Sequence, residues 1–346
     1  MTPSSNRVFG LDLLRALAIV LVLLFHGDTL LNSNFVHRPN FWIIDGVDLF
    51  FVLSGFLIGG ILLKTFDKNI VKESDLITFW KRRWFRTLPN YYFILIICLV
   101  GTILFTKSMS GFNLDYLVFL QNLYSPHDPF FAIAWSLSIE EWFYFTFPLL
   151  VYGMIKLFGS RNIKYYFLIA IGIFFLFPLT YRIYYNNINL RGIVLARIDS
   201  IAFGVLGAYI KQYHSNIWNM SPKICIFIGV SILSSTVYFN GNSFWKNTFN
   251  YDILSIGILL MFPLLSNLTT CLKWISLPIT YVSNISYSLY LIHYSLIMIP
   301  LDNLKPYSSN NIAIGVYVLY FILSFISATL VYKYFEKPIT NMRDKI

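Results

Sequence analysis

The segment 9–30 is apolar enough to span a membrane, yet it carries Arg15 and His26. Ionisable side chains at such a depth are costly in hydrocarbon, and they mark functional sites by default. Eleven helical residues come within about 20° of three full turns, so the two side chains share one face, roughly 16 Å apart along the axis. One helix therefore presents a fixed cation near its start and a titratable base near its end.

The composition is that of a membrane protein with many spans. The 346 residues are 57% hydrophobic and 12% charged, whereas soluble domains carry about 25% charged residues. The 33 Phe, 24 Tyr and 8 Trp suit lipid contact and interfacial belts. The 3 cysteines are scattered through apolar segments, so the sequence indicates neither a disulfide framework nor a metal site.

Hydropathy predicts an all-α transmembrane bundle of about ten spans. We expect one membrane-embedded domain, 1–346, with no appended soluble domain. The segment 111–123 is apolar but too short to span, so we expect it to be re-entrant or interfacial. The predicted helices are 9–30, 44–65, 88–106, 133–158, 164–184, 194–213, 222–239, 252–267, 284–301 and 311–335.

The positive residues between the spans predict the orientation. Eighteen lie on the side of the N-terminus: Arg7, Lys64, Lys68, Lys72, Lys81, Arg82, Arg83, Arg86, Lys156, Arg161, Lys164, Lys211, Lys223, Lys273, Lys333, Lys337, Arg343 and Lys345. Six lie on the other side: Arg38, Lys107, Arg182, Arg191, Lys246 and Lys305. Both termini should therefore be cytoplasmic. The net charge of +10 then reflects topology, and no nucleic-acid partner is indicated.

This topology converts sequence position into depth. His26 then lies near the outer end of the first helix, and Asp48 near the outer start of the second. Glu140 falls in the outer half of the fourth helix, and Arg197 with Asp199 near the outer start of the sixth. A bundle interior tolerates such groups only if they pair or line a wet cavity. Acid, base and cation thus converge in one leaflet.

A basic and aromatic cluster is expected on the opposite, cytoplasmic side, in the loop before the third helix. It contains Arg82, Arg83, Trp84 and Arg86. Arginine forks hold phosphates bidentately, and both arginine and tryptophan stack on flat rings. Anchoring by the positive-inside rule is the alternative reading of this cluster.

The other polar groups also have structural readings. His26 and Asp48 can be a polar pair that joins helices, and Asp12 pairs with the cation three residues later or caps its helix. Glu141 reads as a supporting or structural carboxylate that can exchange roles with its neighbour. His293 follows tyrosines at helical spacing, so an interhelical hydrogen-bond seam and a site role both stay open.

Six motifs in order along the chain resemble the acyltransferase-3 family, whose members are ten-helix membrane enzymes that O-acylate surface glycans. The motifs are Leu11-Asp-Leu-Leu-Arg15 with His26, Gly46-Val-Asp-Leu-Phe-Phe-Val-Leu-Ser-Gly-Phe-Leu-Ile58, Arg83-Trp-Phe-Arg86, Trp135-Ser-Leu-Ser-Ile-Glu-Glu141, Ile285-Ser-Tyr-Ser-Leu-Tyr-Leu-Ile-His293 and Phe335-Glu-Lys-Pro338.

This resemblance implies a multi-pass protein of the bacterial inner or plasma membrane, with an acyl-CoA donor, above all acetyl-CoA, on the cytoplasmic side. It implies a catalytic histidine at His26, a functional arginine at Arg15 and a donor-binding pair at Arg83 and Arg86. The implied acceptor is a glycan or lipid-linked saccharide. Direct transfer, transfer through an acyl-histidine and transfer to a partner protein all stay open.

The expected depths are consistent with acyl transfer across the membrane. Such transfer needs a general base and stabilisation of developing charge. His26 suits the base, and Asp48 at a similar depth would fix its tautomer. The donor's arm would thread much of a ~30 Å hydrocarbon core. Glu140 would position the acceptor or act as a second acid and base, and Arg15 would contact the arm or stabilise charge.

A proton-coupled transporter or glycan flippase is the rival reading, because it would use the same buried groups as a relay. The cytoplasmic basic and aromatic cluster argues against it. So does the lack of Gly- and Pro-broken helices in matching halves.

The charge asymmetry makes a prediction about accessibility in cells. In a variant without the native cysteines, a cysteine near Lys72 should react with an impermeant maleimide only after the cells are opened, whereas one near Asn242 should react in intact cells. The reverse labelling pattern would overturn the orientation.

Overall fold

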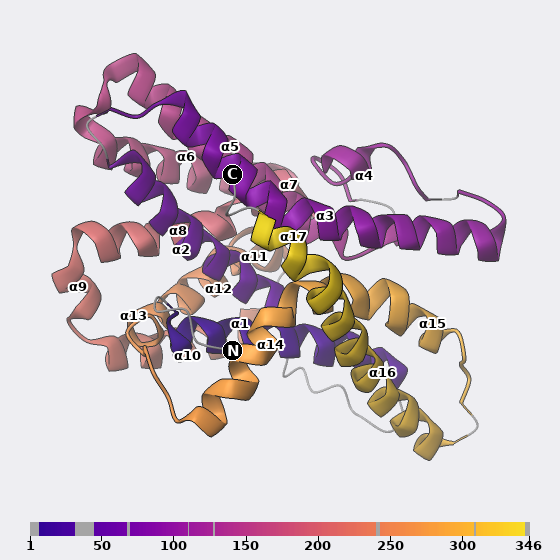
Figure 1. The fold of residues 1–346 in the computed structure, drawn as a ribbon. Helices are drawn as coiled ribbons and strands as arrows, with labels where there is room; N and C mark the ends of the chain where they lie inside the picture. Colours follow the sequence, from indigo (N-terminus) through magenta and orange to yellow (C-terminus); the bar gives the residue numbers. More distant parts are fainter. Residues whose placement is uncertain are drawn as a thin grey trace.

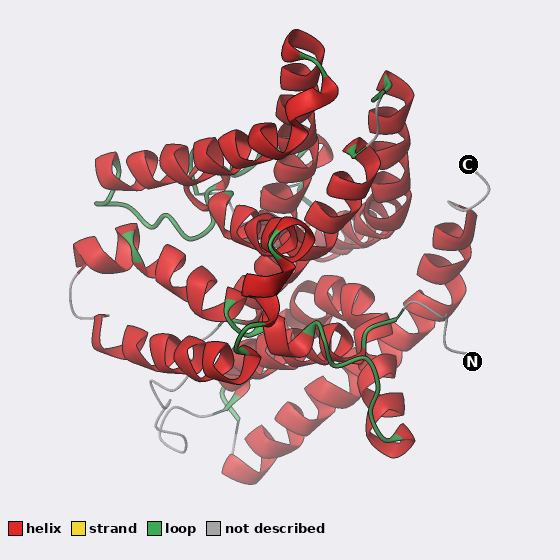
Figure 2. Cartoon of the chain, turned by 90° about the vertical axis from the view of Figure 1, so that its left-hand side faces the viewer, coloured by secondary structure: helices red, strands yellow, loops and turns green. Residues whose placement is uncertain are grey.

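A computed structural model describes residues 7–31, 45–67, 70–109, 111–126, 129–239, 243–307 and 309–342. These ranges contain helices and loops and no strand (Figures 1 and 2), so the predicted all-α class is confirmed. The first half contains α1 (Phe9–Gly27), α2 (Gly46–Phe66), α3 (Glu73–Thr106), α4 (Asp115–Val118), α5 (Ala134–Phe158) and α6 (Ile163–Tyr184). The second half contains α7 (Val194–Arg197), α8 (Asp199–Tyr213), α9 (Ser215–Asn219), α10 (Pro222–Phe239), α11 (Ser243–Thr248), α12 (Asn250–Leu259), α13 (Phe262–Leu265), α14 (Lys273–Ile292), α15 (Ile299–Asp302), α16 (Asn310–Val331) and α17 (Lys337–Met342). Wider, π-helical turns at His293–Met298 and Tyr332–Glu336 follow α14 and α16.

Six helical stretches within these ranges are long and apolar enough to cross a membrane. They are Phe9–Leu30, Gly46–Phe66, Glu73–Phe105, Ser160–Tyr184, Lys273–Asp302 and Asn310–Met342. The other four predicted spans are helical where expected, but α5 carries two adjacent glutamates and the rest are shorter or interrupted. The ten crossings and the orientation therefore stay predictions.

Helix α3 begins earlier than the sequence predicted. Asp75 accepts a hydrogen bond from the backbone nitrogen of Lys72 at 2.9 Å, which is half of a capping box at the helix start. Residues 81–86 thus belong to a helix and not to a loop, and Pro89 lies within it. The prediction failed because the polar residues here lower the hydropathy, although their side chains line a cavity.

The segment 111–123 is no long helix, as its shortness predicted. It contains only α4 and turns, and it packs against α3 and α5. The hydroxyl of Tyr91 donates to the carbonyl of Tyr116 at 2.9 Å, and the indole of Trp142 donates to the carbonyl of Phe119 at 2.9 Å.

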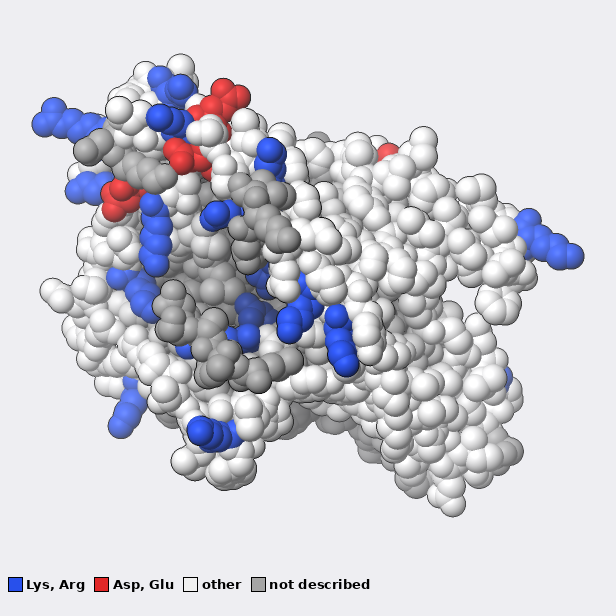
Figure 3. Space-filling view, viewed as in Figure 1, with Lys and Arg blue, Asp and Glu red and all other residues white. Residues whose placement is uncertain are grey.

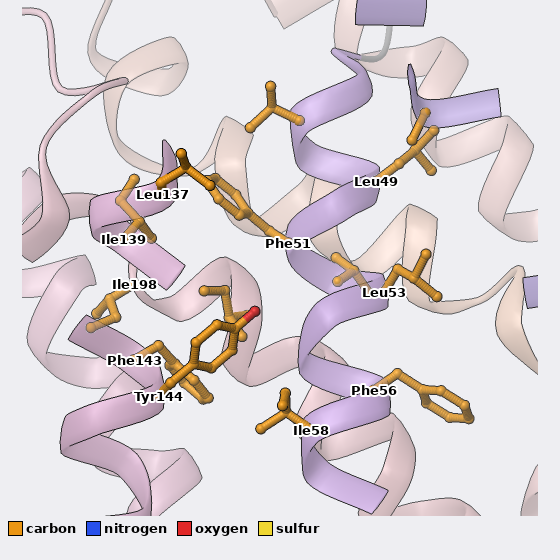
Figure 4. Close-up of a cluster of buried hydrophobic side chains, with 14 of the residues drawn as sticks. Leu49, Phe51, Leu53, Phe56, Ile58, Leu137, Ile139, Phe143, Tyr144 and Ile198 are labelled. Carbon is orange, nitrogen blue, oxygen red and sulfur yellow. The ribbon is translucent and has the colours of Figure 1, made fainter. Parts of the chain in front are cut away.

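Helix α2 lies at the centre of the bundle, and its backbone touches that of α8. A Cβ on Gly55 would lie 1.8 Å from the carbonyl oxygen of Ile201, and one on Gly204 would lie 2.0 Å from that of Val52. Small residues allow such close approach between membrane helices. On another face, apolar side chains of α2 point toward α5, as Figure 4 shows for Phe51 and Leu137.

Buried charges are paired between helices. Arg182 on α6 is fully buried, and it lies 2.5 Å from Asp199 on α8 and 2.7 Å from Asp252 on α12. Removing one partner from such a pair typically costs about 3–5 kcal/mol. In Figure 3, charged side chains gather on the left-hand part of the visible face, whereas the right-hand part is almost entirely uncharged.

The glycine contact can be tested with two neighbouring glycines of α2. We expect Gly55→Ala to destabilise the fold by about 1–3 kcal/mol or more, because the new methyl group would overlap backbone atoms of α8. Gly60→Ala is the matched control, since its Cβ would meet nothing within 4 Å. Thermal unfolding in detergent measures both, and an equal Tm for the two variants would contradict the close contact.

Candidate active site

Two adjoining cavities lie between α2 and α3. The inner cavity measures about 120 Å³ and extends to α1, α5 and α14, with Arg15, Glu140 and Tyr290 in its wall. The mouth cavity measures about 510 Å³ and is lined by Arg82, Asp75 and hydroxyl groups at the start of α3. The two share Ile58, Ile61, Arg83 and Arg86 as lining residues. A roomy basic chamber thus adjoins a narrow, largely apolar one.

Arg83 and Glu140 meet where the cavities adjoin. The Nη2 of Arg83 donates to the hydroxyl of Tyr144 at 2.5 Å and lies 3.5 Å from Oε2 of Glu140. The guanidinium also lies 4.1 Å from the centre of the Tyr144 ring. The Tyr144 hydroxyl, which points toward α2 in Figure 4, bonds to Ser54. These contacts hold Arg83 in one orientation.

The expected separation of Glu140 from the basic cluster is therefore wrong. Arg83 lies ten residues into α3, which is about 15 Å of rise. Glu140 lies in the second turn of α5, and the two side chains meet partway along both helices.

Arg15 lines the inner cavity from α1. Its Nη1 lies 3.5 Å from Oδ1 of Asp12 and 3.3 Å from the hydroxyl of Ser283. Asp12 is buried and is held more closely by Arg7, at 2.7 and 2.8 Å. The predicted pairing of Asp12 with Arg15 is present, and Arg7 takes most of the bonding capacity of that carboxylate.

His26 pairs with His293 across the interface of α1 and α14. The Nδ1 of His26 lies 3.0 Å from Nε2 of His293. The His293 ring lies 5.8 Å from that of Tyr290, which lines the inner cavity. Neither histidine lines either of the two cavities described here. The rings of Tyr290 and His293 therefore connect the wall of the inner cavity to His26. His293 thus contacts His26 across the helix interface, which fits both the hydrogen-bond seam and the site role that the sequence left open.

Asp48 is not the partner of His26, contrary to the prediction. It forms an ion pair with Arg197, which is itself buried. The reason is its place on α2: a Cβ on Gly46 would meet Ala18 of α1 at 2.0 Å, so Gly46 faces α1. Two residues later the helix has turned by about 200°, and Asp48 faces away from α1.

Of the remaining predicted site residues, some line the two cavities and others do not. Arg86 lines both cavities and Arg82 the mouth. Trp84 is 37% exposed, stacks on Trp80 and lines neither of these cavities. Glu141 is buried and accepts a hydrogen bond from Thr87 at 2.8 Å, which matches its supporting role.

Sequence reasoning missed Tyr144 and Tyr290. Tyr144 follows Glu140 by four residues, and Tyr290 precedes His293 by three, so each shares a helix face with a residue that was singled out. That spacing was the available signal. Ser54 carried no comparable signal, because its role depends on how α2 meets α5.

Comparisons with known proteins agree with the motifs. The chain is 28% identical over 354 residues to the O-acetyltransferase OatA of Staphylococcus aureus, and this alignment covers 95% of this chain and 57% of that protein. It is 27% identical over 364 residues to the peptidoglycan O-acetyltransferase OatA of Listeria monocytogenes, covering 97% of this chain and 56% of that one. It thus spans rather more than half the length of these relatives. No solved structure matches significantly. The acyltransferase-3 family model, described as an acyltransferase domain, matches residues 8–333, and the chain therefore belongs to this family of membrane proteins.

Proposed function

We propose that this chain is a membrane O-acyltransferase that moves an acetyl group from cytoplasmic acyl-CoA to a hydroxyl of an extracytoplasmic glycan. The observation that carries the proposal is the pair of adjoining cavities, which share Arg83 and Arg86 as lining residues. Tyr290 lines the inner cavity, and its ring lies 5.8 Å from that of His293, the partner of His26. A basic chamber, a narrow passage and a paired histidine are the parts that such a transfer requires.

The residues of the mouth fit a phosphate-bearing donor. Arg82, Arg83 and Arg86 converge there, and the Nε of Arg83 is buried without a hydrogen-bond partner among the described residues. A buried, unsatisfied donor is rare in a folded protein, and a phosphate oxygen would satisfy it. When bound, acyl-CoA supplies an activated thioester.

The inner cavity suits a slender arm. Its volume of about 120 Å³ lies below the range of roughly 300–1,000 Å³ that pockets for compact ligands occupy. Apolar side chains of α2 form one wall, while Arg15 and Glu140 supply charge at intervals. Arg15 would contact the arm or stabilise developing charge, because it is a fixed cation beside the passage.

His26 would act as the general base. A neutral imidazole takes the proton of an attacking hydroxyl and returns it to the leaving group. Glu140 would not reach His26 without movement, because its ion-pair partner Arg83 holds it at the junction of the cavities. We therefore assign Glu140 to orienting Arg83, and we no longer place Asp48 in the site, because it pairs with Arg197.

The acceptor is proposed to be a cell-envelope glycan such as peptidoglycan, on which the Listeria relative acts by its name. In an alternative route, a partner protein receives the acyl group and passes it to the glycan. Membrane lipid surrounds the helices in either case. The family match to an acyltransferase domain, rather than the cavity itself, argues against the transporter or flippase reading.

His26→Ala should abolish glycan acetylation while the affinity for acetyl-CoA survives, because the basic chamber lies on the far side of the inner cavity. Mass spectrometry of envelope glycans from cells with each variant measures the first property, and calorimetry in detergent measures the second. A folded His26→Ala protein that acetylates at the parent rate would refute the role of the base.

Replacing both Arg83 and Arg86 with Ala should weaken the binding of acetyl-CoA by roughly 2–5 kcal/mol, through loss of charge-assisted hydrogen bonds. Arg161→Ala with Lys164→Ala is the matched control, since it removes the same charge from exposed positions. Calorimetry with acetyl-CoA and with desulfo-CoA would show whether the loss follows the nucleotide part. Equal affinity in both double variants would refute the donor site.

A further inference from the structure

The His26–His293 pair is ordered from the His293 side. The Nδ1 of His293 lies 2.7 Å from the carbonyl oxygen of Tyr290 and 3.1 Å from that of Leu289. The residue is fully buried, and its ring also contacts those of Tyr290 and Tyr294. Two backbone carbonyls of its own helix therefore fix the orientation of this imidazole.

These contacts determine where the protons are. A carbonyl oxygen only accepts hydrogen bonds, so Nδ1 of His293 must carry a hydrogen. In a neutral imidazole the other nitrogen is then an acceptor, and the Nε2 of His293 faces Nδ1 of His26 at 3.0 Å. The Nδ1 of His26 must therefore donate. The lone pair of His26 is left on Nε2.

The neutral form of His293 follows from its surroundings. Within the described part of the chain, its polar partners are two carbonyl groups and His26, and no carboxylate is among them. A buried imidazolium without a nearby anion would carry a large desolvation cost. The nearby acidic residue expected from the sequence, Asp48, is occupied by Arg197.

We infer that His293 is a positioning residue, which holds His26 in the tautomer with hydrogen on Nδ1 and a free lone pair on Nε2. This inference rests on the proposed function in one respect, namely that His26 is the base. His293 takes the place that a carboxylate occupies in triads of nucleophile, histidine and acid. It orients the base without introducing a second charge into the membrane.

The local backbone supports a specialised role. The helix changes from α to π hydrogen bonding at His293, and the wider turn continues to Met298. Turns of this kind are rare and occur frequently at functional sites. An interhelical hydrogen-bond seam with a structural role alone would need the acceptor nitrogen of His293 for stability but not for turnover, and this difference can be tested.

The first test reads the tautomer directly. In detergent-solubilised protein labelled with ¹⁵N-histidine, the nitrogen shifts distinguish protonated from unprotonated ring nitrogens, and His26→Ala identifies the signals. We expect His26 to carry hydrogen on Nδ1 in the parent. In His293→Phe, which keeps a ring but removes the acceptor, we expect a shift toward hydrogen on Nε2. A parent with hydrogen on Nε2 of His26 would overturn the inference.

The second test separates turnover from binding. His293→Phe should lower kcat for acetyl transfer by roughly 10²-fold or more, with an unchanged KM for acetyl-CoA. His293→Gln, whose amide oxygen can accept from Nδ1 of His26, should recover at least tenfold of that loss. His214→Phe, at an exposed histidine, is the control for the substitution itself. A folded His293→Phe protein with the parent kcat would overturn the inference, as would a glutamine variant no better than phenylalanine.

The inference about His293 and the proposed function can be refuted separately. A parent that transfers no acetyl group would refute the proposed function, while the tautomer of His26 would still decide the inference. If His293→Phe does not fold, the tautomer in the parent and the turnover of His293→Gln decide it.

Discussion

A charge inside a membrane bundle must find its counter-charge, and this requirement fixes how the helices of this chain meet. Arg182 joins α6 to α8 and α12 through Asp199 and Asp252. Arg197, at the end of α7, joins that helix to α2 through Asp48. Since an unpaired ion in such a place costs several kcal/mol, alternative packings that separate these partners are excluded. The glycine contact between α2 and α8 then brings the backbones together. The cavities are what remains between helices held in this way.

The same pairing divides the polar residues into a framework and a site. Asp48 and Arg197 neutralise each other and belong to the framework. Arg15 and Arg83 also have acidic neighbours, but at 3.5 Å, and both line the inner cavity. Looser ion pairs beside a cavity keep part of their bonding capacity for a ligand. The distances between the charged atoms therefore distinguish ion pairs that join helices from charged side chains that line the inner cavity.

Much of the fold could be predicted from hydropathy, because helical segments in lipid must be long and apolar. The start of α3 could not, since its arginines resemble a loop until the cavity they line is known. For the site, the sequence singled out Arg15 and His26 on the first helix, and the structure places Arg15 in the wall of the inner cavity but His26 in neither cavity. The partner of His26 lies 267 residues away, and only the packing of α1 on α14 brings it near. The mistaken choice of Asp48 came from treating depth as proximity, when the direction of a side chain around its helix also matters.

The arginine held at the junction of the cavities has a consequence for the cell as well as for the reaction. Any passage that admits a long, flexible molecule into a membrane protein is also a potential leak for protons and small cations. Tyr144 and Glu140 hold the guanidinium of Arg83 where the two cavities adjoin. Glu140 offsets the charge of Arg83, but Arg15 and Arg86 line the same cavity, so its wall keeps a net positive charge that disfavours cations, as in selective pores. The arginines proposed to attract an anionic donor would therefore also oppose the passage of cations.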